Sequence, residues 1–516
     1  MRHSGRWTPK RAALAFGAAC VAAIAVSGAV LAAKWPFGRA AVIARISKDT
    51  GADVAIDRLR TTYFPPGFDA ENIRLNQRGT GVAILSIRRV RIRATYTGII
   101  RKKVSEIDVE GFQLATGHGH SFGSRSSSGG SFGVAKLVAE DGSLEIFSSD
   151  GGHQPFRVSI RSLVLTGIGS SQLGFRVVAR ATRPPANFQA EGRLGQFRSN
   201  SVKSTPISGR YTVSNADLSV LGGVSGLLSS SGKIGGSLGR IEWEGTALVP
   251  DFEVAGTSHK GPLRSDYTIF VDTGDGKTEI QKVRTSFRRS TVLAHGQVSQ
   301  APSAHGKTLG LALRMEQGRV DDLLWLVSGQ PRPGMTGDIR FDASLELPPA
   351  PPKFLRRLML RGNVEITRAL FTNPKLQLPL NYLSESAKGM NKREQRADTQ
   401  QIPGVIRGAV DDSDAVARLT NVHYSAPGVN ASLDGEFNLI HKGINFKGVL
   451  ATEGKLGDGA IGLKSVLLKI ARPFLAIHRK GKITTMAFTI RGSSGHPVLT
   501  VSGSKAAHAA AHLSNR

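Results

Sequence analysis

Hydrophobic and polar residues alternate with a period of two along most of this chain. In "VRIRATY" at 90–96 every second residue is apolar, and the residues between are Arg or Thr. The same alternation occurs in "ADVAIDRL" at 52–59 and in "VSEIDVEGFQL" at 104–114. A strand with one buried and one solvated face has this period, so these stretches predict half-buried β-strands.

Further stretches extend the alternation almost to the end of the chain. They are 239–249, 264–272, 278–287, 334–347, 358–366, 429–440, 443–451 and 483–492. "TGDGK" at 273–277 separates two of them and is a hairpin signal. "TTYFPPGFDAENIRL" at 61–75 predicts an earlier hairpin, in which Pro65, Pro66 and Gly67 make a stiff reversal.

Only five segments have helical patterns, and all are short. They are 37–51, 215–223, 318–329, 380–389 and 463–477. Asn215 is expected to cap the second, and Asp321 and Asp322 favour the first turn of the third. About twenty candidate strands are too many for these helices to cover. The strands therefore either pair into sandwiches, or their apolar face lines a groove that another apolar body fills.

A recurring glycine favours one curved, continuous sheet. The pattern is an apolar residue, a polar residue and then Gly, and it ends at Gly111, Gly245, Gly362, Gly435, Gly448 and Gly492. Glycine inside a strand marks a bulge or a sharp bend, which would curve a continuous sheet. Because the chain has 60 glycines, chance is the other explanation. The predicted fold is mainly β: an elongated, curved antiparallel β-groove with a few short helices and an N-terminal transmembrane helix.

The first residues indicate where the protein resides. Segment 12–33 carries no charge and is about as long as a membrane-spanning helix. Basic residues precede it, so residues 1–11 are expected in the cytoplasm and the remainder outside it. A cleaved signal peptide is the alternative. The expected organisation is a tail (1–11), an anchor (12–33), an N-terminal β region (34–116), a Gly/Ser linker (117–133), a β-rich body (134–504) and a flexible tail (505–516).

Composition narrows the function classes. The net charge of +29 favours anionic partners, and export argues against nucleic acid among them. One cysteine, Cys20, excludes a disulfide framework. His118 and His120 lack further ligands for a metal site. No spacing places a base beside a nucleophile, so we expect neither an enzyme nor a cofactor.

Two regions carry a family resemblance. "GADVAIDRLRTTYFPPGFDAENIRL", followed by "LSIRRVRIRATYTGIIRKKVSEIDVEGFQL", resembles the N-terminal region of AsmA-like proteins. "GDIRFDASLELPP" and "VHYSAPGVNASLDGEFNLIHKGINFKGVL" resemble the C-terminal region of that family. The resemblance implies a bacterial inner-membrane anchor, a periplasmic β-rich body and a role in outer-membrane biogenesis. Relatives, the TamB-like and YhdP-like bridge-type lipid-transfer proteins, are thought to carry phospholipid along a β-groove.

The functional hypothesis is therefore the holding or transfer of phospholipid or another anionic lipid, without chemistry, from the inner membrane. The alternative is an interaction scaffold that regulates envelope protein assembly. Groove-lining candidates are Val90, Ile92, Ala94, Tyr96, Ile107, Val109, Tyr267, Ile269 and Val271. Tyr63 and Phe64 are expected at the groove mouth. A membrane, or an envelope protein at the C-terminal end, is expected to contact Lys464, Lys469, Arg472, Phe474, Arg479, Lys480 and Lys482.

Overall fold

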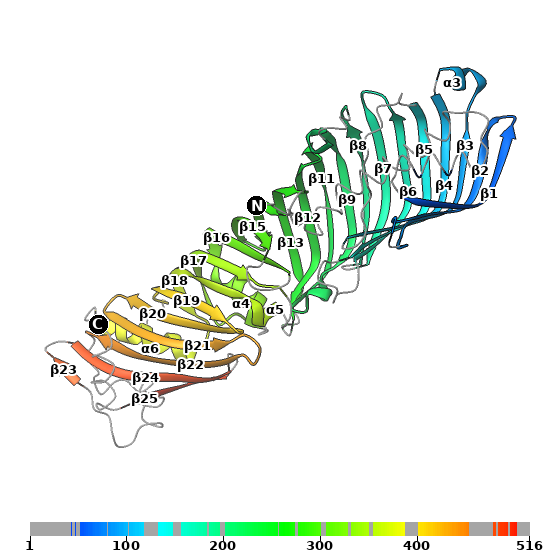
Figure 1. Cartoon of the computed structure of the whole chain (residues 1–516). Coiled ribbons are helices and arrows are strands. Elements are labelled where there is room, and N and C mark those ends of the chain that lie inside the picture. The colour runs from blue at the N-terminus through cyan, green and yellow to red at the C-terminus, as the bar shows by residue number, and fades with distance from the viewer. Residues whose placement is uncertain are drawn as a thin grey trace, which may run out of the picture. The chain divides into compact units, whose positions relative to one another are not determined.

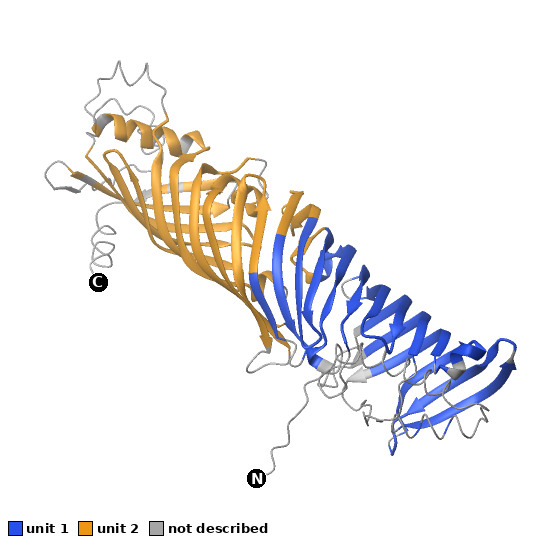
Figure 2. Ribbon diagram, turned by 90° about the horizontal axis from the view of Figure 1, so that it is seen from above, with its two compact units in different colours: residues 1–220, 227–248, 266–281 blue, residues 221–226, 249–265, 282–516 orange. Residues whose placement is uncertain are grey.

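The computed structural model (Figure 1) is mainly β, and its strands pair edge to edge as β-sheet. It describes residues 43, 47, 52–79, 81–101, 103–117, 133–147, 156–182, 185–196, 202–255, 257, 259–273, 277–300, 306–328, 332–349, 354–387, 401–453, 478–480, 483–493 and 496–502. The chain divides into two compact units (Figure 2). Unit 1 comprises Met1–Val220, Leu227–Leu248 and Asp266–Gln281, and unit 2 comprises Leu221–Gly226, Val249–Ser265 and Lys282–Arg516.

Unit 1 contains the first strands, which lie side by side in chain order. They are β1 (Asp53–Tyr63), β2 (Pro66–Asn76), β3 (Ala83–Arg93), β4 (Lys103–Gly117), β5 (Gly133–Phe147), β6 (Phe156–Ile168), β7 (Leu173–Thr182), β8 (Pro185–Leu194), β9 (Ile207–Asp217) and β11 (Leu227–Ser237). A short helix, α3 (Tyr96–Ile100), lies between β3 and β4, and 3-10 turns follow β8 (η1, Val202–Ser204) and β9 (η2, Leu218–Leu221).

Three strands have residues in both units: β12 (Arg240–Val254), β13 (Gly261–Asp272) and β14 (Thr278–Phe287). The short β10 (Val224–Ser225) pairs with the end of β12. Unit 2 continues with β15 (Ser290–Gln300), β16 (Lys307–Arg319), β17 (Met335–Leu347), β18 (Met359–Phe371), β19 (Gly404–Ser413), β20 (Val416–Ala426), β21 (Val429–Asn438), β22 (Gly443–Thr452), β23 (His478–Lys480), β24 (Ile483–Ser493) and β25 (His496–Ser502). Its helices are α4 (Val320–Ser328), α5 (Phe354–Arg357) and α6 (Pro374–Ala387).

One pairing corrects the prediction of a purely antiparallel sheet. β4 and β5 run parallel, with Ile107 opposite Leu137 and Val109 opposite Ala139, whereas the neighbouring pairs are antiparallel. A tight hairpin cannot join parallel strands, because the chain must return to the same end of the sheet. The Gly/Ser segment supplies that return. It therefore connects adjacent strands of one sheet and does not separate two sheets.

Most of the predicted strands are confirmed. The stretch 278–287 is β14 residue for residue, and 61–75 forms the hairpin of β1 and β2. Two details were wrong. The strand predicted to include Tyr96 ends at Arg93, and Tyr96 begins α3. The helix expected at 215–223 is absent: Asn215 to Asp217 still belong to β9, and Leu218–Leu221 form a 3-10 turn. The predicted segments 12–33 and 463–477 lie outside the described residues.

Helix α4 was predicted correctly and is held to the sheet by its first turn. Asp322 is fully buried, and its Oδ2 accepts hydrogen bonds from the backbone N–H of Arg289 and from Ser290 Oγ, both at 2.9 Å. Arg288 Nε lies 3.2 Å from Asp322 Oδ1. The helix then packs its apolar side on the buried Met315 and residues around it. The carboxylate therefore ties α4 to the β14–β15 turn.

We expect Asp322→Ala to loosen α4 locally. The substitution leaves the Arg289 N–H and the Ser290 hydroxyl without their acceptor, which should ease opening of the helix by about 2 kcal/mol. Hydrogen exchange of residues 320–328 should then be about 30-fold faster. Asp342→Ala removes an exposed carboxylate paired with Arg314 and is the matched control. Equal exchange in both variants would contradict this account of α4.

Candidate functional site

In unit 1 one face of the sheet is apolar from strand to strand. The register places one side chain from each strand in a row that crosses the unit: Leu59, Ala70, Val90, Val109, Ala139, Leu163, Val177, Ala190 and Tyr211. A parallel row contains Phe68, Ile92, Ile107, Leu137, Leu165 and Phe175. We call the surface formed by these rows and their counterparts in unit 2 the apolar face.

The apolar face of unit 1 has a buried part and a half-buried part. From β1 to β6 its side chains form one packed cluster that includes four of the groove-lining candidates, Val90, Ile92, Ile107 and Val109. Ala94 is buried as well. The structure thus brings these predicted residues together, but as packed core. They are not open surface.

From β7 onward the face is more open. Phe175, Val177, Phe188, Val213 and Trp243 are only half-buried. These residues were not singled out from the sequence, although the alternation in 173–182 and 207–217 is visible there. The half-buried part of the apolar face, from β7 onward, therefore contains residues that were not predicted from the sequence.

A cluster of hydroxyl groups interrupts this open part. Tyr267 Oη lies 2.5 Å from Tyr211 Oη and 2.7 Å from Ser230 Oγ, which also donates to the Thr246 carbonyl. Burial, and then the hydrogen bond with Tyr267, raise the pKa of Tyr211 well above its ordinary value. Tyr211 therefore stays neutral. The hydroxyl groups of the cluster therefore hydrogen-bond with one another, although they lie on an otherwise apolar surface.

The other predicted residues of unit 1 lie outside the packed cluster of β1 to β6. Tyr267, Ile269 and Val271 lie on β13 and are half-buried, as are Thr268 and Phe270 between them, so their burial does not assign them to one face. Tyr96 is not on the apolar face: it is 52% exposed and its ring contacts Phe64. Phe64 is 86% exposed and covers no other part of the sheet. The side chain of Tyr63 lies outside the described set.

Unit 2 has an apolar face of the same construction. One row contains Leu313, Ala343, Gly362, Val410, Leu419, Gly435, Phe446, Ile490 and Leu499. Helices α4 and α6 cover part of this face: α6 places Leu383 on Tyr424, Ala431 and their neighbours. Large side chains in the uncovered rows, such as Phe446 and Ile490, stay half-buried.

Glycines on the apolar face make room for aromatic rings. A Cβ at Gly448 would lie 2.7 Å from the Phe488 ring, and a Cβ at Gly435 would overlap the ring of Phe446. The same arrangement joins Gly142 with Phe112, Gly245 with Tyr211, and Gly404 with Tyr424. Aromatic side chains that occupy the space above glycines let the strands approach. Two of the six glycines predicted to bend the sheet, Gly435 and Gly448, lie under phenylalanines, whereas Gly111 has a φ of 64° where one pair is missing from the β3–β4 ladder and the register is unchanged.

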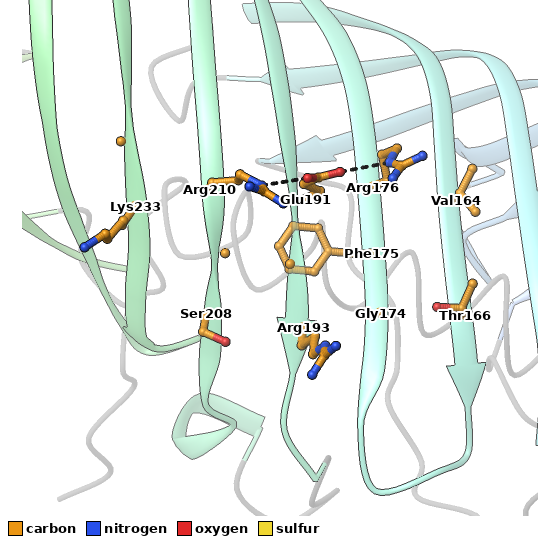
Figure 3. Close-up of a pocket in the computed structure, with 13 residues that line it drawn as sticks. Val164, Thr166, Gly174, Phe175, Arg176, Glu191, Arg193, Ser208, Arg210 and Lys233 are labelled. Atoms are coloured by element: carbon orange, nitrogen blue, oxygen red, sulfur yellow. Dashed lines mark hydrogen bonds and ion pairs between the residues drawn. The ribbon is translucent and has the colours of Figure 1, made fainter.

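The opposite face is charged, and the charges form rungs across neighbouring strands. Arg176 Nε and Arg210 Nε lie 3.1 Å and 2.7 Å from the two oxygens of Glu191, so that three strands carry one network (Figure 3). Hydrogen bonds from Arg210 and Arg176 lower the pKa of Glu191. Around this rung is a cleft of about 1050 Å³, whose lining includes Arg193 and Lys233 and also the apolar Val164 and Phe175.

A second cleft, in unit 2, contains the same pattern of charged side chains across neighbouring strands. Its volume is about 480 Å³, and it contains Arg340, Glu365 and Arg407 on three adjacent strands. Arg407 Nη2 lies 2.6 Å from Glu365 Oε1. Because the same charge pattern lies in both clefts, we interpret the rungs as a feature of the sheet that keeps this face in water. No nucleophile with an adjacent base occurs among the residues that line either cleft.

One carboxylate lies in a row of the apolar face. Asp412 stands between Leu360 and Ala417 in the register, is only 2% exposed, and its Oδ1 has no hydrogen-bond partner among the described residues. Burial, and then the charge of Asp411, raise the pKa of Asp412 to about 6. The face is therefore least polar when this group is protonated.

Most of the predicted C-terminal contact lies beyond what the structure describes. This applies to Lys464, Lys469, Arg472, Phe474 and Lys482. Arg479 and Lys480 belong to β23, which pairs with the start of β24. Among the described residues no helix has the length and apolar character needed to span a bilayer.

Comparisons with protein-family models, with curated proteins and with solved structures find no match to this chain. The AsmA-like resemblance therefore remains a prediction from the residues quoted above.

We expect Gly448→Ala to weaken the pairing of β22 with its neighbours. The new Cβ would meet the Ser432 carbonyl, Leu433 and the Phe488 ring, all closer than 3.0 Å, and such overpacking costs about 1–3 kcal/mol. Hydrogen exchange of β22 and β24 should rise accordingly. Gly310→Ala is the matched control, since a Cβ there meets nothing within 4 Å. Similar exchange in the two variants would contradict the role given to glycine.

Asp412→Asn should stabilise unit 2 in a pH-dependent way. The folded state holds the Asp412 proton up to about pH 6, whereas the unfolded chain releases it near 3.8, so the wild type loses stability as pH rises between these values. Above about pH 7 the variant should be more stable by up to about 3 kcal/mol, and near pH 4 the difference should vanish. Hydrogen exchange of β19 and β20 against pH measures this. Glu436→Gln, at an exposed ion pair, should show no such dependence.

Proposed function

We propose that this protein holds phospholipid acyl chains against the apolar face of its sheet and passes them along that face without chemistry. The observation that carries the proposal is the continuity of the apolar rows. In both units they pass from strand to strand, and large side chains such as Val177 and Phe446 remain half-buried. Over Phe175, Val177 and Phe188 the described residues of unit 1 place no helix. A half-buried, continuous apolar surface suits a long, apolar and conformationally flexible ligand.

The free energy of an exposed acyl chain explains why such a face would be useful. Each CH₂ moved into water costs about 0.8 kcal/mol, so a 16-carbon chain costs roughly 12 kcal/mol. A surface that stays in contact with the chain along the way removes most of that barrier. Aromatic side chains occupy the space above glycines on this surface, as at Gly435 and Gly448. Transfer of this kind needs neither a catalytic residue nor a cofactor.

The cellular setting follows from the sequence and is part of the proposal. The uncharged segment 12–33 would anchor the chain in a bacterial inner membrane, with the β-rich bulk in the periplasm. The net charge of +29 favours anionic lipid surfaces. The AsmA-like resemblance supports a role in outer-membrane biogenesis. An envelope protein at the C-terminal end would be a further partner.

A scaffold for envelope proteins is the second candidate. The half-buried apolar rows favour it as well, because apolar segments of a protein could occupy the same face. In that case the partner would be a polypeptide and no lipid would move. The two candidates differ in what Val177 touches.

Photocrosslinking decides between them. A photoreactive residue in place of Val177, in the full chain in its own membrane, should capture phospholipid. Val178 is the matched control, because it is the next residue of β7, is also half-buried and points to the charged face. It should capture little or no lipid. Capture of protein alone at Val177 would favour the scaffold, and equal lipid capture at both positions would overturn the proposal.

A further inference from the structure

An aromatic pair projects from one end of the strands in unit 1. Phe64 lies in the two-residue connection between β1 and β2, and at 86% exposure it is the most exposed large apolar side chain among the described residues. Its ring meets Tyr96 of α3 edge to face, with centroids 5.6 Å apart. The two rings come from connections that are separated in the chain but lie at the same end of the sheet. We call this feature the aromatic tip.

The fold holds the aromatic tip rigidly in place. Tyr63 pairs with Pro66 directly below the connection, and the Ala94 N–H donates to the Pro66 carbonyl at 2.9 Å, which links the hairpin to the residues just before α3. The Gly98 N–H in turn donates to Thr95 Oγ1 at 3.0 Å. An apolar pair that water surrounds so fully contributes little to folding. At 86% and 52% exposure, Phe64 and Tyr96 are accessible to a partner.

Basic residues accompany the aromatic tip. Arg101 and Lys103 directly follow α3 and are exposed, and Arg60 is exposed on β1 near the connection. The acids close by are already engaged: Glu106 lies 3.4 Å from Arg93 and 3.0 Å from Lys136. Exposed aromatic rings beside cations are typical of protein surfaces that sit in the interfacial layer of an anionic bilayer.

The aromatic tip also adjoins the apolar face. Phe68 and Ile92, which face each other in the register and belong to that face, lie only a few residues from Phe64 and Tyr96 along their strands. A bilayer in contact with the aromatic tip would therefore lie next to the end of the apolar rows.

We propose that the aromatic tip, with the basic residues that follow α3, inserts into the interfacial layer of an anionic phospholipid bilayer. Its purpose, holding unit 1 at the bilayer that supplies the lipid, rests on the proposed function, whereas the insertion itself does not. Phe64 and Tyr96 would enter the acyl–headgroup boundary, and Arg101 and Lys103 would contact lipid phosphates. The partner is thus the membrane surface itself.

The test uses the full chain in phosphatidylglycerol-containing liposomes with brominated acyl chains. In a Cys20→Ser background, Phe64→Cys carries an environment-sensitive fluorophore, and Leu227→Cys, also an exposed apolar position of unit 1 at 49%, is the matched control. We expect quenching at position 64 to exceed that at 227 several-fold. Adding Arg101→Gln and Lys103→Gln should reduce it. Equal quenching at positions 64 and 227 would overturn the proposal. It would also be overturned if the fluorophore at position 64 responded to an added protein and not to liposomes.

A second measurement changes Phe64 alone and follows the rate of lipid crosslinking at Val177. Phe64→Ser should slow the accumulation of lipid crosslinks at Val177 several-fold while leaving their final amount unchanged; an unchanged rate counts against the role of the aromatic tip. The two proposals fail separately. Immersion of position 64 without lipid at Val177 would overturn the proposed function alone, and lipid at Val177 without immersion of position 64 would overturn the insertion alone.

Discussion

The structure depends on side-chain alternation that is kept in register across neighbouring strands. Each strand presents every second residue to the same side, and a slip of one residue would move its whole apolar set to the other face. In unit 1 the register keeps Val90, Val109 and Ala139 in one row, and the row continues to Tyr211 on β9. The glycines under aromatic rings serve the same constraint, because they let large side chains share a row without forcing the strands apart.

The charged face confines the apolar side chains to one side of the sheet. Exposed ion pairs such as Arg176–Glu191 each contribute little to stability, because water screens them. Their effect is to keep one side of the sheet hydrated, because burying unpaired charges is costly. Any apolar partner is thereby directed to the other face. The same reasoning explains why the cleft around Glu191 is a weak candidate for a ligand site, although its volume is large.

The apolar face is graded along the chain, and this gradation bears on function. Between β1 and β6 it is packed core, from β7 it is half-buried, and in unit 2 the helices α4 and α6 cover part of it. A surface for a mobile lipid must leave apolar side chains accessible, which the packed core does not do. Phe175, Val177 and Phe446 are therefore better positioned to meet a ligand than Ile92 or Val109. The aromatic tip lies at the packed end, where a bilayer contact would complement it.

The sequence by itself determined the elements that depend on local patterns. Period-two alternation located β14, and paired acids before an apolar run located α4, because both signals lie within a few residues. Tertiary structure alone decided the rest. The parallel pairing of β4 and β5 depends on which strand the chain meets after its Gly/Ser return. Tyr211 and Tyr267 meet across 56 residues. Whether an apolar residue is core, as Ile92 is, or half-open surface, as Val177 is, depends on how many neighbours the fold places around it, and alternation is the same in both cases.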